Sequence, residues 1–96
     1  MRYNRSQTIK EVLENYVRAF KFSDKLTEVR LQESWEKLMG LNIARHTSKI
    51  ELRKNVLYIV IDNAALKSEL SFAKKKIADA VNKDLEKIIV YDVVII

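Results

Sequence analysis

The chain of 96 residues has the length of one domain, and 48% of its residues are hydrophobic, which is enough for a buried core. It has no cysteine, which excludes disulfides and thiolate chemistry, and no apolar run near the roughly 20 residues of a membrane span. Its polar start is unlike a secretory signal, and its net charge of +5 suits a polyanionic partner. These features predict a single cytoplasmic domain, residues 1–96.

Two helices are expected before the single glycine. Thr8 and Glu11 form a capping box for an N-terminal helix within residues 1–22. Ser23 is a good N-cap for a second helix, and Gly40 is a good stop for it. Apolar residues recur in both segments at the 3.6-residue period of an amphipathic helix. They are Ile9, Val12, Leu13, Tyr16, Val17 and Phe20 in the first segment, and Leu31, Trp35, Leu38 and Met39 in the second.

After the glycine, the apolar period changes from 3.6 to 2, which is typical of strands. If Lys54 and Asn55 form a two-residue turn, Leu52 pairs with Leu57 and Ile50 with Ile59, although Lys-Asn is a weaker turn pair than Asn-Gly and leaves the exact loop open. The turn and the alternation of apolar residues then agree on one register, so this segment is predicted to be a β-hairpin.

Asn63 is expected to cap a third helix that ends near Asn82. The last segment, Ile88–Ile96, is apolar at nearly every position. It is either a central strand covered on both faces, or a surface that pairs with a second copy to form a homodimer. The order α-α-β-β-α-β predicts an α+β fold, with a three-stranded mixed sheet and helices mainly on one face. The buried stripe of the third helix is predicted as Leu66, Leu70, Ala73, Ile77 and Val81.

Several short motifs in the last two-thirds of the chain occur in the same order in a known bacterial family. The motifs are Trp35-x-x-x-x-Gly40, Ile43-Ala44-x-His46-Thr47, Leu57-x-Ile59-x-Ile61, Glu69-Leu70-x-Phe72-x-Lys74, and the later Ile77 and Asn82. Together they resemble the DciA-type proteins, the loaders or operators of the bacterial replicative helicase.

The resemblance implies a KH-like fold, with a family-like core over residues 31–96, as well as DNA binding and contact with a DnaB-type replicative helicase. Ordinary KH domains clamp a nucleic-acid backbone with a Gly-x-x-Gly loop. A chain with one glycine has no such loop. Nucleic acid is therefore expected to bind another surface.

The outer face of the predicted hairpin is one candidate surface. Basic side chains there would neutralise phosphates, and an exposed tyrosine would offer a stacking plane for a base. The alternative is an ordinary solvent-facing strand. The residues of this face are Arg45, Lys49 and Arg53, beside Tyr58 and Val60, with Lys54 at the turn.

The third predicted helix is the other candidate surface. Lys74, Lys75 and Lys76 are the most concentrated charge in the chain. Lys67 precedes Lys74 by seven residues, so the two are expected on nearly the same side of one helix. The alternative is again a solvated face.

His46 and Trp35 are residue types found in catalytic or binding sites, but the strand and helix periodicity favours a structural role for both. His46 has the strand parity of Ile50 and Leu52, so it is expected to face the helices as a packed or hydrogen-bonded residue. Trp35 lies on an apolar helical stripe and is expected in the core. One histidine without cysteine provides no recognisable metal-ligand set, and no catalytic residue or cofactor is predicted.

These observations favour a non-enzymatic, sequence-independent DNA-binding accessory factor of replication that recruits or positions the replicative helicase. Two alternatives remain open. One is a protein-interaction adaptor that binds through Tyr58, Val60, Phe72 or the last strand and has no affinity for nucleic acid. The other is a KH-like RNA-binding protein. An enzyme has the least support, because the sequence has no phosphate-binding glycine loop and no cysteine nucleophile.

Overall fold

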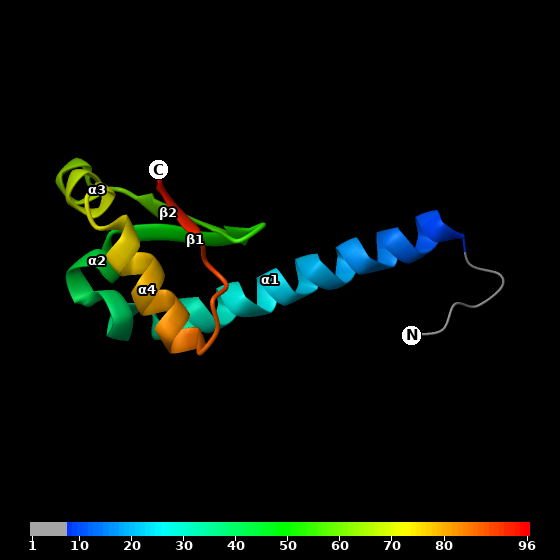
Figure 1. Cartoon of the computed structure of the whole chain (residues 1–96). Coiled ribbons are helices and arrows are strands. Elements are labelled where there is room, and N and C mark those ends of the chain that lie inside the picture. The colour runs from blue at the N-terminus through cyan, green and yellow to red at the C-terminus, as the bar shows by residue number, and fades with distance from the viewer. Residues whose placement is uncertain (1–7) are drawn as a thin grey trace.

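The computed structural model describes residues 8–96, in which long helices precede and flank a small sheet (Figure 1). The sheet has the order β1-β2-β3, with β1 antiparallel and β3 parallel to the central β2. The predicted α+β class with a three-stranded mixed sheet is confirmed. The elements are α1 (Ile9–Met39), α2 (Leu41–Arg45), β1 (Thr47–Arg53), β2 (Val56–Ile61), α3 (Ala64–Ser71), α4 (Lys74–Leu85) and β3 (Asp92–Ile95).

The first 31 helical residues form one continuous helix, α1, so the predicted break at Ser23 is wrong. Thr8 caps α1 as expected, because its hydroxyl accepts a 3.2 Å hydrogen bond from the Glu11 amide. Neither glycine nor proline occurs between Phe20 and Thr27, and a serine inside a helix costs well under about 1 kcal/mol. Helix propagation therefore passes through Ser23. Residues 1–7 of the predicted N-terminal segment lie outside the described residues.

Gly40 ends α1 as predicted, and its φ of 88° is a conformation that residues with a side chain rarely adopt. The segment that follows is the short helix α2 rather than the start of a strand. The Thr47 hydroxyl donates a 2.7 Å hydrogen bond to the Ile43 carbonyl, which closes the end of α2. Arg45 is therefore a helical residue, and its predicted place on the outer face of the hairpin is wrong.

The β1–β2 hairpin has the predicted register, with Leu52 opposite Leu57 and Ile50 opposite Ile59. Lys54 and Asn55 form its two-residue turn, with φ values of 49° and 67°. Positive φ at both central residues is the property of type I′ turns, whose twist matches that of the flanking strands.

The predicted third helix is divided into α3 and α4 at Phe72 and Ala73. The Asn63 side chain caps α3 as predicted, accepting a 3.0 Å hydrogen bond from the Leu66 amide. At its other end, the Phe72 amide donates to the Glu69 carbonyl and the Ala73 amide to the Leu70 carbonyl. These three-residue spacings tighten the last turn and end α3 without glycine or proline.

The strand β3 is shorter than the predicted Ile88–Ile96 strand. The backbone just before β3 is held by side-chain hydrogen bonds instead of strand pairing. Asn82 on α4 provides most of these bonds with its side-chain amide. Its oxygen accepts from the backbone amides of Ile89 at 3.0 Å and Val90 at 2.8 Å, and its nitrogen donates to the Val90 carbonyl at 2.8 Å. Asn55 adds a 2.7 Å bond to the Ile89 carbonyl. These side-chain bonds replace strand pairing for this part of the backbone.

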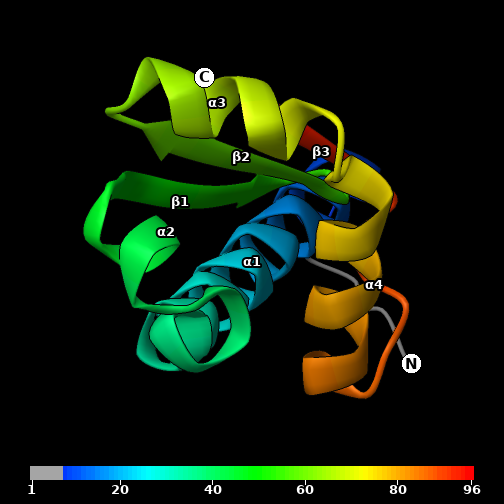
Figure 2. The same ribbon diagram turned by 90° about the vertical axis from the view of Figure 1, so that its left-hand side faces the viewer.

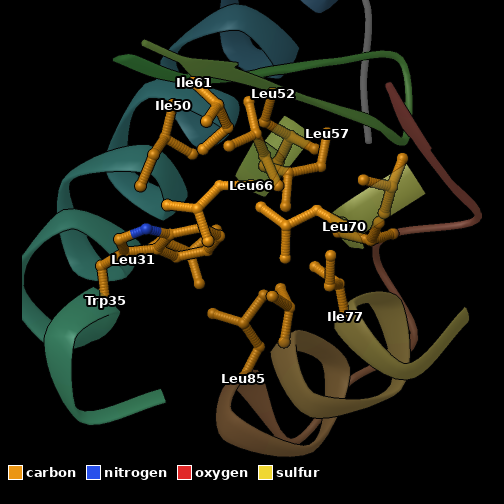
Figure 3. Close-up of a cluster of buried hydrophobic side chains, with 14 residues drawn as sticks. Leu31, Trp35, Ile50, Leu52, Leu57, Ile61, Leu66, Leu70, Ile77 and Leu85 are labelled. Carbon is orange, nitrogen blue, oxygen red and sulfur yellow. The ribbon is translucent and has the colours of Figure 1, made fainter. Parts of the chain in front are cut away.

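The core lies between one face of the sheet and the helices α1, α3 and α4 (Figure 3). Leu31 and Trp35 of α1 meet Ile50 and Leu52 of the sheet, while Ile77 and Leu85 of α4 close the core from the other side (Figure 3). Figure 2 shows α1 and α4 beneath the strands. Only the second half of α1 takes part, and the first half projects away from the rest of the chain (Figure 1).

Candidate nucleic-acid interface

The hairpin surface, which we define as Lys49, Arg53, Lys54 and Tyr58, lies on the uncovered side of the sheet and its turn. Lys49 and Arg53 are exposed on β1, and Lys54 is exposed in the turn. Tyr58 on β2 is half-buried and lies opposite Glu51 of β1. The structure therefore brings these four residues into one region, as the alternation predicted.

Glu51 neutralises part of this surface. Its carboxylate lies 3.7 Å from the Lys49 ammonium and 3.7 Å from Nε of Arg53. The Arg53 guanidinium also covers the Tyr58 ring, 4.3 Å from its centroid, in a cation–π contact. One plane of the tyrosine is thus occupied. The same period of 2 that places Lys49 and Arg53 on one face also places Glu51 there, so the sequence carried the signal for this neutralisation.

The second surface, the α3–α4 corner, consists of Lys67, Phe72, Lys74, Lys75 and Lys76. Lys67 belongs to α3 and the three consecutive lysines open α4, so the prediction that Lys67 and Lys74 share one side of one helix is wrong. All four lysines are exposed. The ion pairs found between described residues involve none of them.

Phe72, in the junction, is 89% exposed, the largest value among the big apolar side chains of the described residues. The N-terminus of α4 is a place where positive charge is unfavourable, because the unpaired amides of a helix start carry a partial positive charge. Here Ala73 provides no side-chain cap, and three lysines follow directly. The corner therefore combines concentrated positive potential with an exposed aromatic ring.

The two surfaces are separate. Figure 1 places the junction of α3 and α4 at one end of the sheet and the β1–β2 turn at the other. A short ligand could therefore contact only one of the two surfaces at a time.

His46 does not lie on the inner face of the sheet, because it is the C-cap residue of α2 and precedes β1. A bulge at Ser48 also changes the parity at the start of β1. Thr47 is paired with Ile61, but Lys49 is paired with its neighbour Val60, so β1 has one extra residue at this point. As a result Thr47 points inward, and its hydroxyl accepts a 3.0 Å hydrogen bond from the indole nitrogen of Trp35.

The His46 ring instead lies at the surface, half-buried, with Nδ1 2.8 Å from the Asp62 carboxylate. The prediction of a hydrogen-bonded residue is confirmed, and the predicted direction is wrong. Sequence spacing gave no means of identifying Asp62 as its partner. Trp35 is buried, as expected for a core residue.

Within residues 8–96, no three acidic, histidine or cysteine side chains are grouped closely enough to hold a metal ion. None of the helices in this range is both long and apolar enough to cross a membrane.

Comparison with known proteins gives one clear relationship. The family model described as "Dna[CI] antecedent, DciA" matches residues 7–95, which is nearly the whole chain. Neither the curated proteins nor the solved structures include a significant match to the chain. The DciA family is associated with DNA replication and with loading of the replicative helicase. The match agrees with the motifs between Trp35 and Asn82 and extends over α1 as well as the sheet: the chain belongs to the DciA family.

Proposed function

We propose that this protein is a non-enzymatic accessory factor of DNA replication that binds DNA without sequence specificity and contacts the replicative helicase. The α3–α4 corner is the observation that carries the DNA-binding part. Its four lysines are exposed and take part in none of the ion pairs of the described residues, whereas Glu51 partly neutralises Lys49 and Arg53 of the hairpin surface. We therefore rank the corner above the hairpin surface as the site of contact.

The corner suits a single strand best. Phosphates of the backbone would be neutralised by Lys74, Lys75 and Lys76, and this contribution depends on charge alone and weakens as salt increases. An unpaired base would stack on Phe72, which a base inside a duplex cannot do. No base-reading contact is needed for either interaction, so the proposed binding is independent of sequence.

The helicase contact rests on membership of the family. We propose that it takes place in the cytoplasm, where a bacterial replicative helicase acts, and that residues 1–96 act as one KH-like unit with its core in residues 31–96. A positively charged corner would hold single-stranded DNA next to a bound helicase. It would thereby raise the local concentration of DNA, the substrate of the helicase.

A protein-interaction adaptor without nucleic-acid binding is the second candidate, and the outer sheet face favours it. Tyr58, Val60 and Val94 are apolar or aromatic, lie on that face and are only half-buried, and the charges beside them are partly neutralised by Glu51. Such a surface is better matched to a protein than to a phosphate backbone. Preference for RNA over DNA is the third alternative.

The C-terminal segment Ile88–Ile96 is a further proposed contact, through which two copies would form a homodimer. Ile88, Tyr91 and Ile96 are exposed in it. β3 also lies at an edge of the sheet, which is where a strand of another chain can add.

Fluorescence anisotropy with a labelled single-stranded DNA oligonucleotide, at low and at physiological salt, tests the proposal. Duplex DNA and RNA of the same sequence are titrated in parallel. The triple variant Lys74→Glu, Lys75→Glu, Lys76→Glu is expected to lose at least tenfold in affinity. It should also flatten the slope of log Kobs against log salt by about 2, since single strands release roughly 0.7 counterion per neutralised phosphate.

Lys83→Glu with Lys87→Glu is the control for charge reversal elsewhere, with two charges reversed instead of three, because both exposed lysines lie at or just beyond the other end of α4. It should change the affinity less than threefold, and so should Lys49→Glu with Arg53→Glu. Phe72→Ala should weaken single-strand binding by roughly 1–3 kcal/mol and leave duplex binding nearly unchanged. If the wild-type protein binds no nucleic acid at low salt, the DNA-binding proposal is refuted and direct binding to the helicase becomes the next measurement.

A further inference from the structure

The projecting half of α1 carries an apolar stripe that nothing in the described chain covers. The stripe consists of Ile9, Leu13, Tyr16, Val17 and Phe20, which are between 53% and 77% exposed. The Tyr16 and Phe20 rings contact each other, with centroids 5.9 Å apart, and do not reach the core. From Thr8 to Ser23 every residue is exposed except the half-buried Val12.

The stripe has the spacing of a helix-pairing seam. Ile9, Leu13, Tyr16 and Phe20 follow one another at intervals of four, three and four residues, which is the alternation of the two apolar positions of a heptad. A stripe of this kind buries its side chains against a second helix of the same kind. We propose that the occupant is α1 of a second copy of this chain, and that the two helices pair antiparallel.

The area of the stripe matches what such a pair requires. Taking roughly 150–200 Å² for a fully exposed side chain of this size, the exposed fractions leave about 500 Å² on one chain. This equals the largest apolar patches of typical monomers, which are often functional. Two copies together would bury at most about 1,000 Å², the lower limit of specific interfaces, so the stripe is sufficient for a weak dimer.

The direction of pairing follows from where the sheet lies. Leu13 and Leu31 are 18 residues apart, which is five helical turns, so the stripe and the core-facing side of α1 point in the same direction. In a parallel pair the two sheets would occupy the same space between the helices. An antiparallel pair places each globular part beyond the start of the other α1, which also separates two chains of net charge +5 and opposes their helix dipoles.

One antiparallel register matches every apolar residue of the seam with another. It places Ile9 opposite Phe20 of the second copy and Leu13 opposite Tyr16 of the second copy. The two-fold axis then lies between Glu14 and Asn15, and an isologous contact of this kind closes at two chains.

Sedimentation equilibrium of the full chain from about 5 to 500 µM measures the association, and Phe20→Gln tests the seam. Phe20→Gln is expected to raise the dimer Kd at least tenfold. Phe22→Gln is the matched control, because Phe22 is 67% exposed against 62% for Phe20 and lies on the opposite side of α1. It should change the Kd less than threefold. Leu13→Gln is the second seam variant, and far-UV circular dichroism establishes that each variant retains its helix.

The orientation is measured with spin labels, because a chain without cysteine accepts a single one at any chosen position. Glu11→Cys, Arg18→Cys and Lys25→Cys lie at seven-residue intervals on one side of α1. In the proposed register, the two labels of a dimer are offset along the axis by about 10 Å at positions 11 and 18, and by about 30 Å at position 25. A parallel dimer gives equal distances at all three positions and overturns the proposal.

Three other outcomes also overturn it. The first is a monomer at every concentration. The second is an equal effect of Phe20→Gln and Phe22→Gln. The third is a dimer that survives Phe20→Gln and is lost with Ile96→Lys, which would assign self-association to the C-terminal segment. If the chain is monomeric and Phe20→Gln instead abolishes binding to the replicative helicase, the occupant of the stripe is the helicase rather than a second copy.

Discussion

The carboxylate of Glu28 on α1 accepts a 3.1 Å hydrogen bond from the backbone amide of Leu52 on β1. β1 is an edge strand, and this amide points away from β2 toward the helix. Glu28 is only 8% exposed. The exposed edge of a sheet is a template for the addition of another strand. Here the buried carboxylate of Glu28 on α1 occupies one donor of the β1 edge.

Removal of that acceptor should destabilise the fold. We expect Glu28→Ala to lower the free energy of unfolding by about 1–3 kcal/mol, because a buried amide is left without a partner. Glu28→Gln keeps a carbonyl oxygen in place and should lose less. Urea denaturation measures both, with Glu33→Ala on the exposed side of the same helix as the control. Equal losses for Glu28→Ala and Glu33→Ala would contradict the role assigned to the bond.

Asp24, one turn before Glu28, should make stability depend on pH. Burial raises the pKa of Asp24 above its usual 3.8, a hydrogen bond from the Lys54 backbone opposes the shift, and the charge of Glu28 adds to it. The folded chain therefore retains this proton at pH values where the unfolded chain has lost it. The contribution of Asp24 to stability is complete below the unfolded pKa and is lost as the pH rises through the folded pKa.

Asp24→Asn removes this titration and keeps an acceptor for the Lys54 amide. We expect it to raise the free energy of unfolding at about pH 7 by at most about 0.5 kcal/mol, since the group is only partly buried. Well below the unfolded pKa of 3.8 the residue is protonated in both states, and the gain should vanish. A gain of the same size at both pH values would mean that the effect has another origin.

Asn82 should be the most sensitive polar residue of the C-terminal half. Its side chain makes three hydrogen bonds to the backbone of Ile89 and Val90, and we expect Asn82→Ala to cost about 2–3 kcal/mol in urea denaturation. Asn82→Asp retains the acceptor for both amides and loses the donor, so its loss should be smaller. Asn15→Ala, on the projecting half of α1, is the control and should change stability by less than about 0.5 kcal/mol.

Glu51→Gln distinguishes the two basic surfaces without removing any positive charge. It frees Lys49 and Arg53 from the carboxylate 3.7 Å away from each of them. If DNA binds at the α3–α4 corner, as proposed, the affinity for single-stranded DNA should change less than twofold. An increase of fivefold or more in anisotropy titrations at low salt would assign binding to the hairpin surface, because only there does the variant raise the local positive potential.

The elements that were predictable from sequence are those with a local chemical signal. Thr8 and Asn63 each cap a helix, and Gly40 ends one, because a side-chain oxygen or a missing Cβ decides the backbone there. The hairpin register followed from a two-residue turn and an alternation that agree. Residue patterns within a few positions of one another were sufficient for these elements.

The errors occur where tertiary packing decides between locally similar options. Ser23 is chemically suited to a cap but lies within α1, while the α3–α4 break at Phe72 has no glycine or proline to announce it. Both candidate sites were affected. Lys67 and Lys74 are on different helices, Arg45 is on α2, His46 is the C-cap of α2, and the bulge at Ser48 turns Thr47 inward.

Because α1 runs without a break through Ser23, the number of residues between the apolar stripe and the core-facing residues of α1 sets the direction of the stripe. Each residue inserted between Lys21 and Asp24 would rotate everything before it by about 100° around the helix axis and move it about 1.5 Å outward. A single inserted alanine would thus turn the apolar stripe about 100° away from the core-facing side of α1 without altering its composition. A seven-residue insertion would return the stripe to within about 20° of its present direction and move it about 10 Å farther from the sheet along the helix axis.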